Sequence, residues 1–186
     1  DVPLFAHGRL REIQTGRTPA FGTSFKVAWG GNHVYFAIRC EEPYEKSILI
    51  GSERNDDPAV LNGDCVVLLL ETEQNSFYQI AVNPAGTVLD LNRKGGEETY
   101  RWDAQADVAT NIGDGFWTVE MRIPVTEDTN DPFHHLIGRR PLRTLSWYMN
   151  LCRLRPRETA TEMSAFSPTS TDEILVPERF AKFYYK

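Results

Sequence analysis

Alternation of apolar and polar residues is the dominant pattern in this chain, and it predicts β-strands rather than helices. The clearest example is the segment from Gly63 to Asp90, in which the apolar run CVVLLLE, the alternating run FYQIAVN and the short run TVLDL follow one another. An acidic turn separates the first two runs, and Pro84-Ala85-Gly86 separates the last two. The segment therefore predicts consecutive antiparallel strands, the first of them buried on both faces.

The polar residues of this segment are the first candidates for a binding site; they are Asp64, Gln79, Asn83 and Asp90. In a strand, Tyr78, Ile80 and Val82 share one face, so that Gln79 and Asn83 take the other. Their spacing requires some of the polar side chains to point into a sheet face rather than into solvent.

Two hairpins are predicted on either side of this segment. The runs TSFKVAW and HVYFAIRCEE flank a Gly-Gly-Asn turn at 30–32, and AQADVATNI and FWTVEMRIP flank Gly113-Asp114-Gly115. Glycine and asparagine in short loops are typical of the turns that join antiparallel strands. In the last of these strands, the residues that share the apolar face are Trp117, Val119, Met121 and Ile123.

The remaining runs complete an all-β chain. RTLSWYMNLCRLR predicts a long strand, MSAFS a short pairing segment and RFAKFYY a closing strand, whereas residues 1–22 carry several Pro and Gly and predict an irregular lead-in. No window of about 11 residues shows a helical period. We therefore expect one domain over 1–186, an antiparallel β-sandwich of about ten strands with an immunoglobulin-like or jelly-roll-like architecture.

Composition excludes some functions. A formal net charge of −6 and a pI near 5.3 argue against a nucleic-acid partner. No apolar run approaches the roughly 20 residues of a membrane span, which argues against a membrane partner. The absence of an initiator Met and of a signal-peptide pattern makes us expect an excised domain or a processed fragment.

Charge is unevenly distributed, because six arginines gather in one C-terminal region: Arg139, Arg140, Arg143, Arg153, Arg155 and Arg157. They could be solvated or paired with the acidic excess, or they could form a basic patch that faces an anionic ligand. Glu53, Asp56, Asp57 and Asp64 cluster around one loop and could hold a structural calcium ion, although the spacing of a calcium-binding loop is missing. No other cofactor is expected.

The three cysteines, Cys40, Cys65 and Cys152, show no metal-binding spacing. We expect buried thiols, with a Cys40–Cys152 disulfide as the alternative. No motif for a nucleophile, a phosphate loop, a dinucleotide site or a zinc protease is present, so we expect no enzymatic activity.

Aromatic residues near turns suggest a different kind of ligand. Tyr100 and Trp102 lie in a Gly- and charge-rich loop, where their rings could stack on the apolar face of a sugar. The hydroxyl groups of a sugar need amide or charged partners, and the chain offers Gln79, Asn83, Arg153 and Arg155. These six residues form the predicted carbohydrate-binding set.

The order of several segments resembles the family 9 carbohydrate-binding modules and their relatives. These segments are FKVAWGGNHVYFAIRCEEP, GDCVVLLLET, YQIAVNPAGTVLD, GFWTVEMRIP, NLCR, MSAFSP and PERFAKF, and they cover most of residues 23–185. The resemblance implies a β-sandwich that binds sugars, often at chain ends and sometimes with structural calcium. It also implies a bacterial, extracellular or periplasmic accessory module, beside the catalytic domain of a protein that degrades polysaccharides.

Several residues that contact the sugar in the family are replaced in this chain. Family members that bind sugar ends clamp the ring between two Trp, and those positions are Leu61 and Ile174 here. A family Glu falls on Val67 and a family Arg on Ala81, so that only Gln79 and Asn83 remain of the expected set. Loss of two stacking rings should abolish that mode of binding.

Three functions follow from these observations. The first is a noncatalytic carbohydrate-binding accessory module of a larger glycan-degrading protein, for which an arginine-rich face would favour an acidic polysaccharide. The second is a structural or interdomain β-sandwich that has lost sugar binding. The third, a haem-binding relative, needs an axial pair such as Met121, Met149 or Met163 with His33 or His134.

Overall fold

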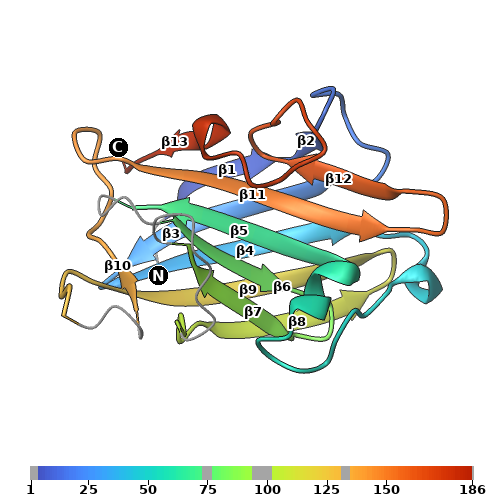
Figure 1. The fold of residues 1–186 in the computed structure, drawn as a ribbon, viewed down its shortest axis with the longest axis horizontal. Coiled ribbons are helices and arrows are strands. Elements are labelled where there is room, and N and C mark those ends of the chain that lie inside the picture. The colour runs from blue at the N-terminus through green and yellow to red at the C-terminus, as the bar shows by residue number, and fades with distance from the viewer. Residues whose placement is uncertain (1–3, 73–76, 94–101, 131–134, 186) are drawn as a thin grey trace.

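Two β-sheets pack face to face in the computed structural model, which describes residues 4–72, 77–93, 102–130 and 135–185 (Figure 1). The strands are β1 (Leu4–Arg9), β2 (Arg11–Glu12), β3 (Thr23–Gly30), β4 (His33–Glu41), β5 (Cys65–Glu71), β6 (Phe77–Val82), β7 (Val88–Asn92), β8 (Asp107–Gly113), β9 (Phe116–Thr126), β10 (Leu136–Ile137), β11 (Trp147–Pro156), β12 (Thr161–Ala165) and β13 (Ala181–Phe183). Short 3₁₀ helices are η1 (Glu45–Ser47), η2 (Pro58–Asn62) and η4 (Pro177–Arg179). The predicted antiparallel all-β sandwich is confirmed.

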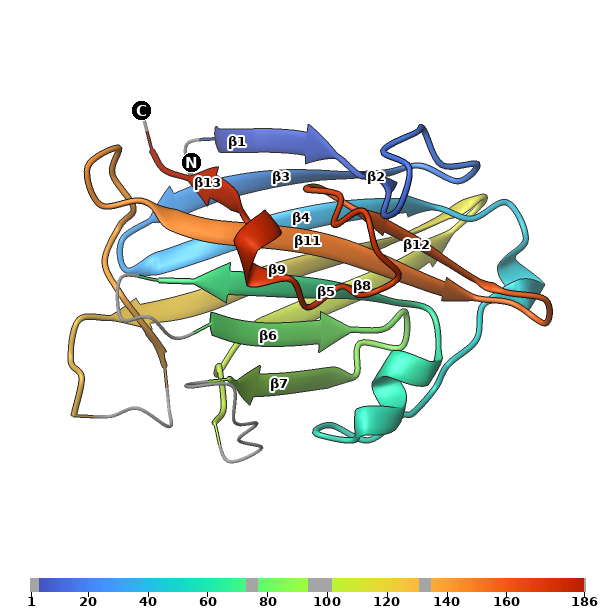
Figure 2. The ribbon, with the colours of Figure 1, turned by 45° about the horizontal axis from the view of Figure 1, so that its top comes forward.

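The first sheet, sheet A, has the order β1-β3-β4-β9-β10, with β8 also paired to β9. The second, sheet B, has the order β2-β12-β11-β5-β6-β7, with β13 also paired to β11. Figure 2 shows β1, β3 and β4 side by side in one layer and β11, β5, β6 and β7 in the other. All strand pairs are antiparallel except the short pair of β9 and β10.

Both predicted hairpins form. Strands β3 and β4 pair from Thr23↔Cys40 to Gly30↔His33, and β8 and β9 pair up to Gly113↔Phe116. In each two-residue turn one glycine has a positive φ, Gly31 at 58° and Gly115 at 79°. Glycine adopts this conformation without the strain that a side chain would cause.

Sheet B is covered by apolar side chains on both faces. Its inner face joins sheet A in the main core, which includes Val66, Leu68 and Leu70 of β5. Its outer face carries a second cluster of buried residues, which we call the outer cluster: Ile13, Val60, Cys65, Val67, Leu69, Ala81, Leu89, Leu91, Cys152, Leu154, Ala165 and Phe180. The continuous run CVVLLLE is therefore a strand buried on both faces, as predicted.

The lead-in expected over residues 1–22 is wrong in one respect, because this segment contains β1 and β2. Strand β1 pairs with the edge of β3, and β2 pairs with β12 through Glu12↔Ser164. Long-range pairing stabilises these strands, which local alternation does not mark, and the same holds for the two-residue strand β10. Strand β13, in contrast, lies within the predicted closing strand RFAKFYY. No helix in the described part of the chain is long and apolar enough to cross a membrane.

Candidate functional site

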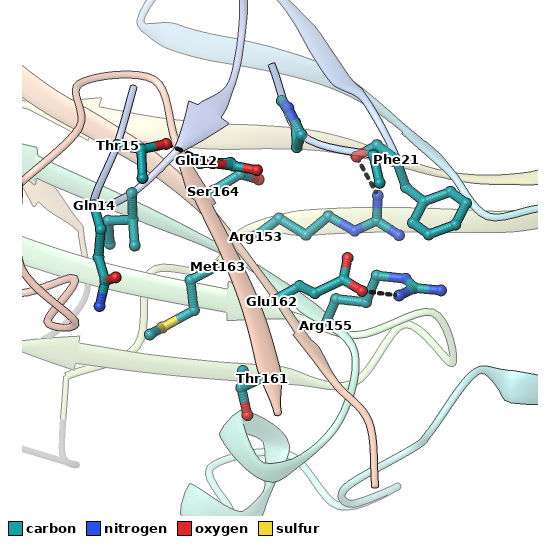
Figure 3. A pocket seen from close by; sticks show the side chains of 13 residues that line it. Glu12, Gln14, Thr15, Phe21, Arg153, Arg155, Thr161, Glu162, Met163 and Ser164 are labelled. Carbon is teal, nitrogen blue, oxygen red and sulfur yellow. Dashed lines mark hydrogen bonds and ion pairs between the residues drawn. The ribbon is translucent and has the colours of Figure 1, made fainter. Parts of the chain in front are cut away.

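A hollow of about 270 Å³ opens where β2 and β12 meet the connection that leads to β3; we call it the β2–β12 pocket (Figure 3). Strand β2 pairs only with Ser164 and Ala165, so the pocket forms beside the part of β12 that β2 leaves uncovered. The residues that line it are Glu12, Ile13, Gln14, Thr15, Pro19, Ala20, Phe21, Arg153, Arg155, Thr161, Glu162, Met163 and Ser164.

Two arginines form the inner wall of this pocket because of the alternation in β11. Trp147, Met149 and Leu151 of this strand point into the main core. Since side chains alternate between faces, Arg153 and Arg155 continue the same inward-facing row. Both side chains are nearly inaccessible to solvent, so each needs hydrogen-bonding partners.

Glu42 is the main partner of these arginines. Its fully buried carboxylate accepts hydrogen bonds from Arg155 Nε (2.7 Å) and Nη2 (3.0 Å), from Arg157 Nη2 (2.7 Å) and from Arg153 Nη2 (3.3 Å). Burial alone would raise the pKa of Glu42, but the hydrogen bonds and charge of Arg155, with the charges of Arg157 and Arg153, hold this pKa below its ordinary value. The carboxylate is therefore ionised throughout the neutral range.

Two more carboxylates complete the cluster. Asp64 accepts from Arg157 Nη1 at 2.9 Å and from the backbone N–H of Leu49 at 2.8 Å, and Glu162 accepts from Arg155 Nη1 at 2.7 Å. Three guanidinium groups are thus matched by three carboxylates. The arginine-rich region at this end of the sandwich is an internal ion-pair network with no excess charge.

Phe21 closes one side of the pocket. Its ring lies over the guanidinium of Arg155, 4.2 Å from the ring centre, and meets the ring of Tyr44 edge-on at 6.0 Å. Its backbone carbonyl accepts from Arg153 Nη1 at 3.5 Å. Figure 3 shows Glu12 and Thr15 across the pocket from Phe21 and Glu162, with Arg153 between them.

The structure brings only two residues of the predicted set, Arg153 and Arg155, into one site. Asn83 holds the β6–β7 turn, because its Oδ1 accepts from the N–H groups of Ala85 and Thr87 and its Nδ2 donates to the carbonyl of Ser52. Tyr100 lies outside the described residues.

Trp102 is not a surface platform. Its ring is 1% exposed, packs 4.7 Å from the ring of Tyr78, and donates from Nε1 to the carbonyl of His135 at 3.1 Å. The expectation that it stacks on a sugar does not match this placement, because no ring face is open.

Gln79 lies on the outer face of sheet B. Its Oε1 accepts from Arg93 Nε at 2.9 Å, whereas its buried Nε2 has no hydrogen-bond partner among the described residues. The four positions at which an apolar residue replaces a family ligand residue lie on the same outer face: Val67 and Ala81 belong to the outer cluster, and Leu61 and Ile174 pack against it. Apolar packing therefore occupies the place of the expected sugar clamp.

The residues considered for calcium or haem binding lie in structural positions or line the pocket. Asp57 caps η2, and the described residues contain no group of three or more His, Cys, Asp or Glu side chains that could hold a metal ion. Met121 and Met149 lie in the main core, Met163 lines the β2–β12 pocket, and His134 lies outside the described residues.

The three cysteines are buried and free, which confirms the expected thiols and not the alternative disulfide.

Sequence reasoning missed Glu12, Phe21 and Glu42. The first two lie in residues 1–22, where no local pattern marks them. Glu42 could have been found, because the apolar face of β4, Val34 to Cys40 at every second residue, continues to it. An acid in an inward-facing position predicts a buried cationic partner.

No profile of a known protein family matches the sequence, and no curated protein matches it. Several solved structures, however, match its fold. A candidate carbohydrate-binding protein from Bacteroides uniformis ATCC 8492 superposes with a TM-score of 0.75 at 15% identity, over 98% of this chain and 87% of that one. A family 9 carbohydrate-binding module from Caldicellulosiruptor kristjanssonii superposes with a TM-score of 0.63 at 14% identity, over 100% of this chain, in complexes with cellotriose and with glucose that are covered to 83% and 84%. The chain therefore has the fold of these modules, as the sequence resemblance implied.

Proposed function

We propose that the chain is a noncatalytic carbohydrate-binding module that takes a sugar in the β2–β12 pocket. The shared fold and the ordered set of family-like segments support this role. In keeping with the resemblance, we propose that it is an accessory domain of a larger, secreted bacterial protein that degrades polysaccharides outside the cytoplasm. There it would hold a catalytic domain near its substrate.

One observation favours the β2–β12 pocket as the sugar-binding site. The aromatic ring of Phe21 lines the same pocket as the half-buried Glu12 and the exposed side chains of Gln14 and Glu162. A sugar needs this combination, because its C–H face packs on apolar surface while its hydroxyl groups bond to carboxylate and amide oxygens. The outer face of sheet B lacks it, since apolar side chains stand at the expected ligand positions.

The volume and the charge of the pocket indicate which class of sugar it would bind. The volume of about 270 Å³ lies just below the roughly 300–1,000 Å³ typical of pockets for drug-sized ligands, so we expect one sugar unit inside it. Arg153 and Arg155 are already neutralised by Glu42 and Glu162, and Glu12 adds a further carboxylate. We therefore expect a neutral sugar in this pocket rather than an acidic one.

Calorimetric titration with neutral mono- and oligosaccharides tests the proposal. Two variants probe the pocket: Glu12→Gln removes a charge-assisted hydrogen bond, and Phe21→Leu keeps apolar bulk but removes the flat ring. We expect each to weaken binding about tenfold, the effect of about 1.4 kcal/mol. Glu178→Gln, on η4 and outside the pocket, removes the same charge as Glu12→Gln and should bind like the wild type.

Equal loss in Glu178→Gln, or binding that neither pocket variant changes, would place the sugar elsewhere. Failure to bind any glycan on a broad array would instead favour the structural β-sandwich. The apolar residues at the clamp positions, Leu61 and Ile174, are the observation that keeps this second function in view.

A further inference from the structure

The outward face of sheet A is hollowed next to its free edge, on the other side of the sandwich from the outer cluster. A depression of about 710 Å³ lies across β1, β3, β4 and β9, which run side by side in Figure 2. The outward-facing side chains that line it are His7, Arg9, Ser24, Lys26, Ala37, Arg39, Thr118 and Glu120. We call this surface the sheet A depression.

Strand register arranges these residues in two rows across the sheet. The first row runs Arg9, Ser24, Arg39, Thr118, and the second runs His7, Lys26, Ala37, Glu120, each residue directly opposite the next. Adjacent strands are about 4.8 Å apart, so side chains from three neighbouring strands surround the small residues in the middle. A linear ligand can lie across this arrangement.

Small residues form the floor of the depression. Ala37 is exposed in the middle of the sheet, between Lys26 and Glu120, although alanine is disfavoured in strands relative to larger side chains. Ser24 separates Arg9 from Arg39 in the same way. The longer side chains therefore stand as walls around an open centre.

Positive charge dominates these walls although the whole chain carries a net charge of −6. The residues that line the depression include the cations Arg9, Lys26 and Arg39 and one carboxylate, that of Glu120. Arg39 pairs with Glu41 at 2.8 Å, but within the described residues neither Arg9 nor Lys26 has a carboxylate partner.

A second hollow of about 310 Å³ continues the positive surface. It shares Arg9 and Ser24 with the sheet A depression and adds Arg11, whose Nη1 donates to the hydroxyl of Thr18 at 2.6 Å. Its only acidic lining residue is Glu41. The two hollows share lining residues and so form one continuous surface.

We propose that the sheet A depression binds a strand of acidic glycan through Arg9, Lys26 and Arg39. Carboxylates along such a strand would pair with these cations, while its hydroxyl groups bond to Ser24 and Thr118. This site is distinct from the β2–β12 pocket and does not depend on sugar binding there. Exposed ion pairs are individually weak, so the affinity comes from several contacts along one chain and falls with added salt.

Affinity electrophoresis in gels that contain polygalacturonate tests the site, with dextran gels as the neutral reference. We expect the wild type to be retarded by polygalacturonate, and the retardation to disappear in 1 M salt. The double variant Arg9→Gln with Lys26→Gln should weaken binding about tenfold, since two exposed ion pairs of about 0.7 kcal/mol each are lost. The matched control, Arg179→Gln on η4 with Lys182→Gln on β13, changes the net charge equally away from sheet A and should leave the retardation unchanged.

The variant Glu120→Gln should change the affinity in the opposite direction. Removal of the one carboxylate in the depression should strengthen binding of an acidic strand severalfold, whereas a neutral glycan that used Glu120 as an acceptor would bind more weakly. No retardation of the wild type, or equal loss in both double variants, would overturn the proposal, as would equal binding of double-stranded DNA. Glu12→Gln should leave this retardation intact. The proposal for the β2–β12 pocket and the proposal for the sheet A depression can therefore be contradicted separately.

Discussion

Arg155 donates two parallel hydrogen bonds to Glu42, from Nε to Oε2 at 2.7 Å and from Nη2 to Oε1 at 3.0 Å, with side chains that are 6% and 0% exposed. The pair joins the end of β4 in sheet A to β11 in sheet B. Bidentate geometry of this kind fixes orientation as well as charge. The contact therefore sets how the two sheets meet beside the β2–β12 pocket.

Replacement of Glu42 by Gln should destabilise the protein by about 3–5 kcal/mol, because the buried guanidinium groups of Arg153 and Arg155 and the partly buried one of Arg157 lose their shared carboxylate. Urea unfolding measures the change. Glu41→Gln is the control one residue away: its ion pair with Arg39 is about half exposed, so we expect a loss below about 1 kcal/mol. Similar losses in the two variants would contradict the network.

The same network predicts an acid-sensitive component of stability. Since the pKa of Glu42 is lower in the folded state than in the unfolded state, its contribution is present above the unfolded pKa and is lost as pH falls through the folded pKa. Melting temperatures from pH 6 to pH 3 should therefore fall more steeply for the wild type than for Glu42→Gln.

Asp90 predicts the opposite trend. Burial raises the pKa of this carboxyl to about 7, with added repulsion from Asp56 and Asp103, although the N–H of Ala104 donates to it at 2.7 Å. Its protonated form is favoured in the folded state, so its contribution is full below about pH 4 and is lost as pH rises through about 7. Asp90→Asn, which can still accept from Ala104, should remove a decline of about 2–4 kcal/mol between pH 4 and pH 8.

Unfolding free energies of Asp90→Asn and of Asp114→Asn across this pH range check the assignment. Asp114 is exposed in the β8–β9 turn, where Asn serves equally well before Gly115. A wild-type profile that stays parallel to that of Asp90→Asn would show that Asp90 is not the titrating group.

The three buried thiols should be inert in the native protein. Burial raises the pKa of Cys40 to about 11 and that of Cys152 to about 12, and it also raises the pKa of Cys65. Because the thiolate is the reactive form, Ellman's reagent at pH 8 should find no fast-reacting thiol before denaturation and three after it. Only one thiol after denaturation would indicate a disulfide.

Two tryptophans offer a matched comparison in the core. Trp102 and Trp117 are both buried. Nε1 of Trp102 donates to the carbonyl of His135, whereas Nε1 of Trp117 has no hydrogen-bond partner in the part of the chain that the structure describes. We expect Trp102→Phe to destabilise the protein by about 1 kcal/mol more than Trp117→Phe, since only the first loses a hydrogen bond and leaves an acceptor unpaired. Urea unfolding of the two variants measures the difference, and a larger loss in Trp117→Phe would contradict it.

Alternation predicts most of this fold, because a sandwich needs one side of each strand inside. The two faces of FYQIAVN and the apolar face of β9 follow directly from it. Strands β1 and β2 could not be predicted in this way, since they are stabilised by pairing with β3 and β12, far along the chain.

The site was less accessible to prediction. The sequence marks Arg153 and Arg155 as a charged group, but their neutralisation depends on Glu42, which comes from the other sheet. Trp102 follows a Gly-rich loop, which suggests exposure, yet contact with Tyr78 places its ring in the core. Charge balance and burial both depend on residues that only the folded chain brings together.

The outer cluster has a consequence for how this fold tolerates substitution. Leu61 and Ile174 pack against an apolar layer that is separate from the core between the sheets. Substitutions there remodel a covering layer and leave the contact between sheets A and B intact. That face of sheet B can therefore accept substitutions without a change in the packing of the two sheets.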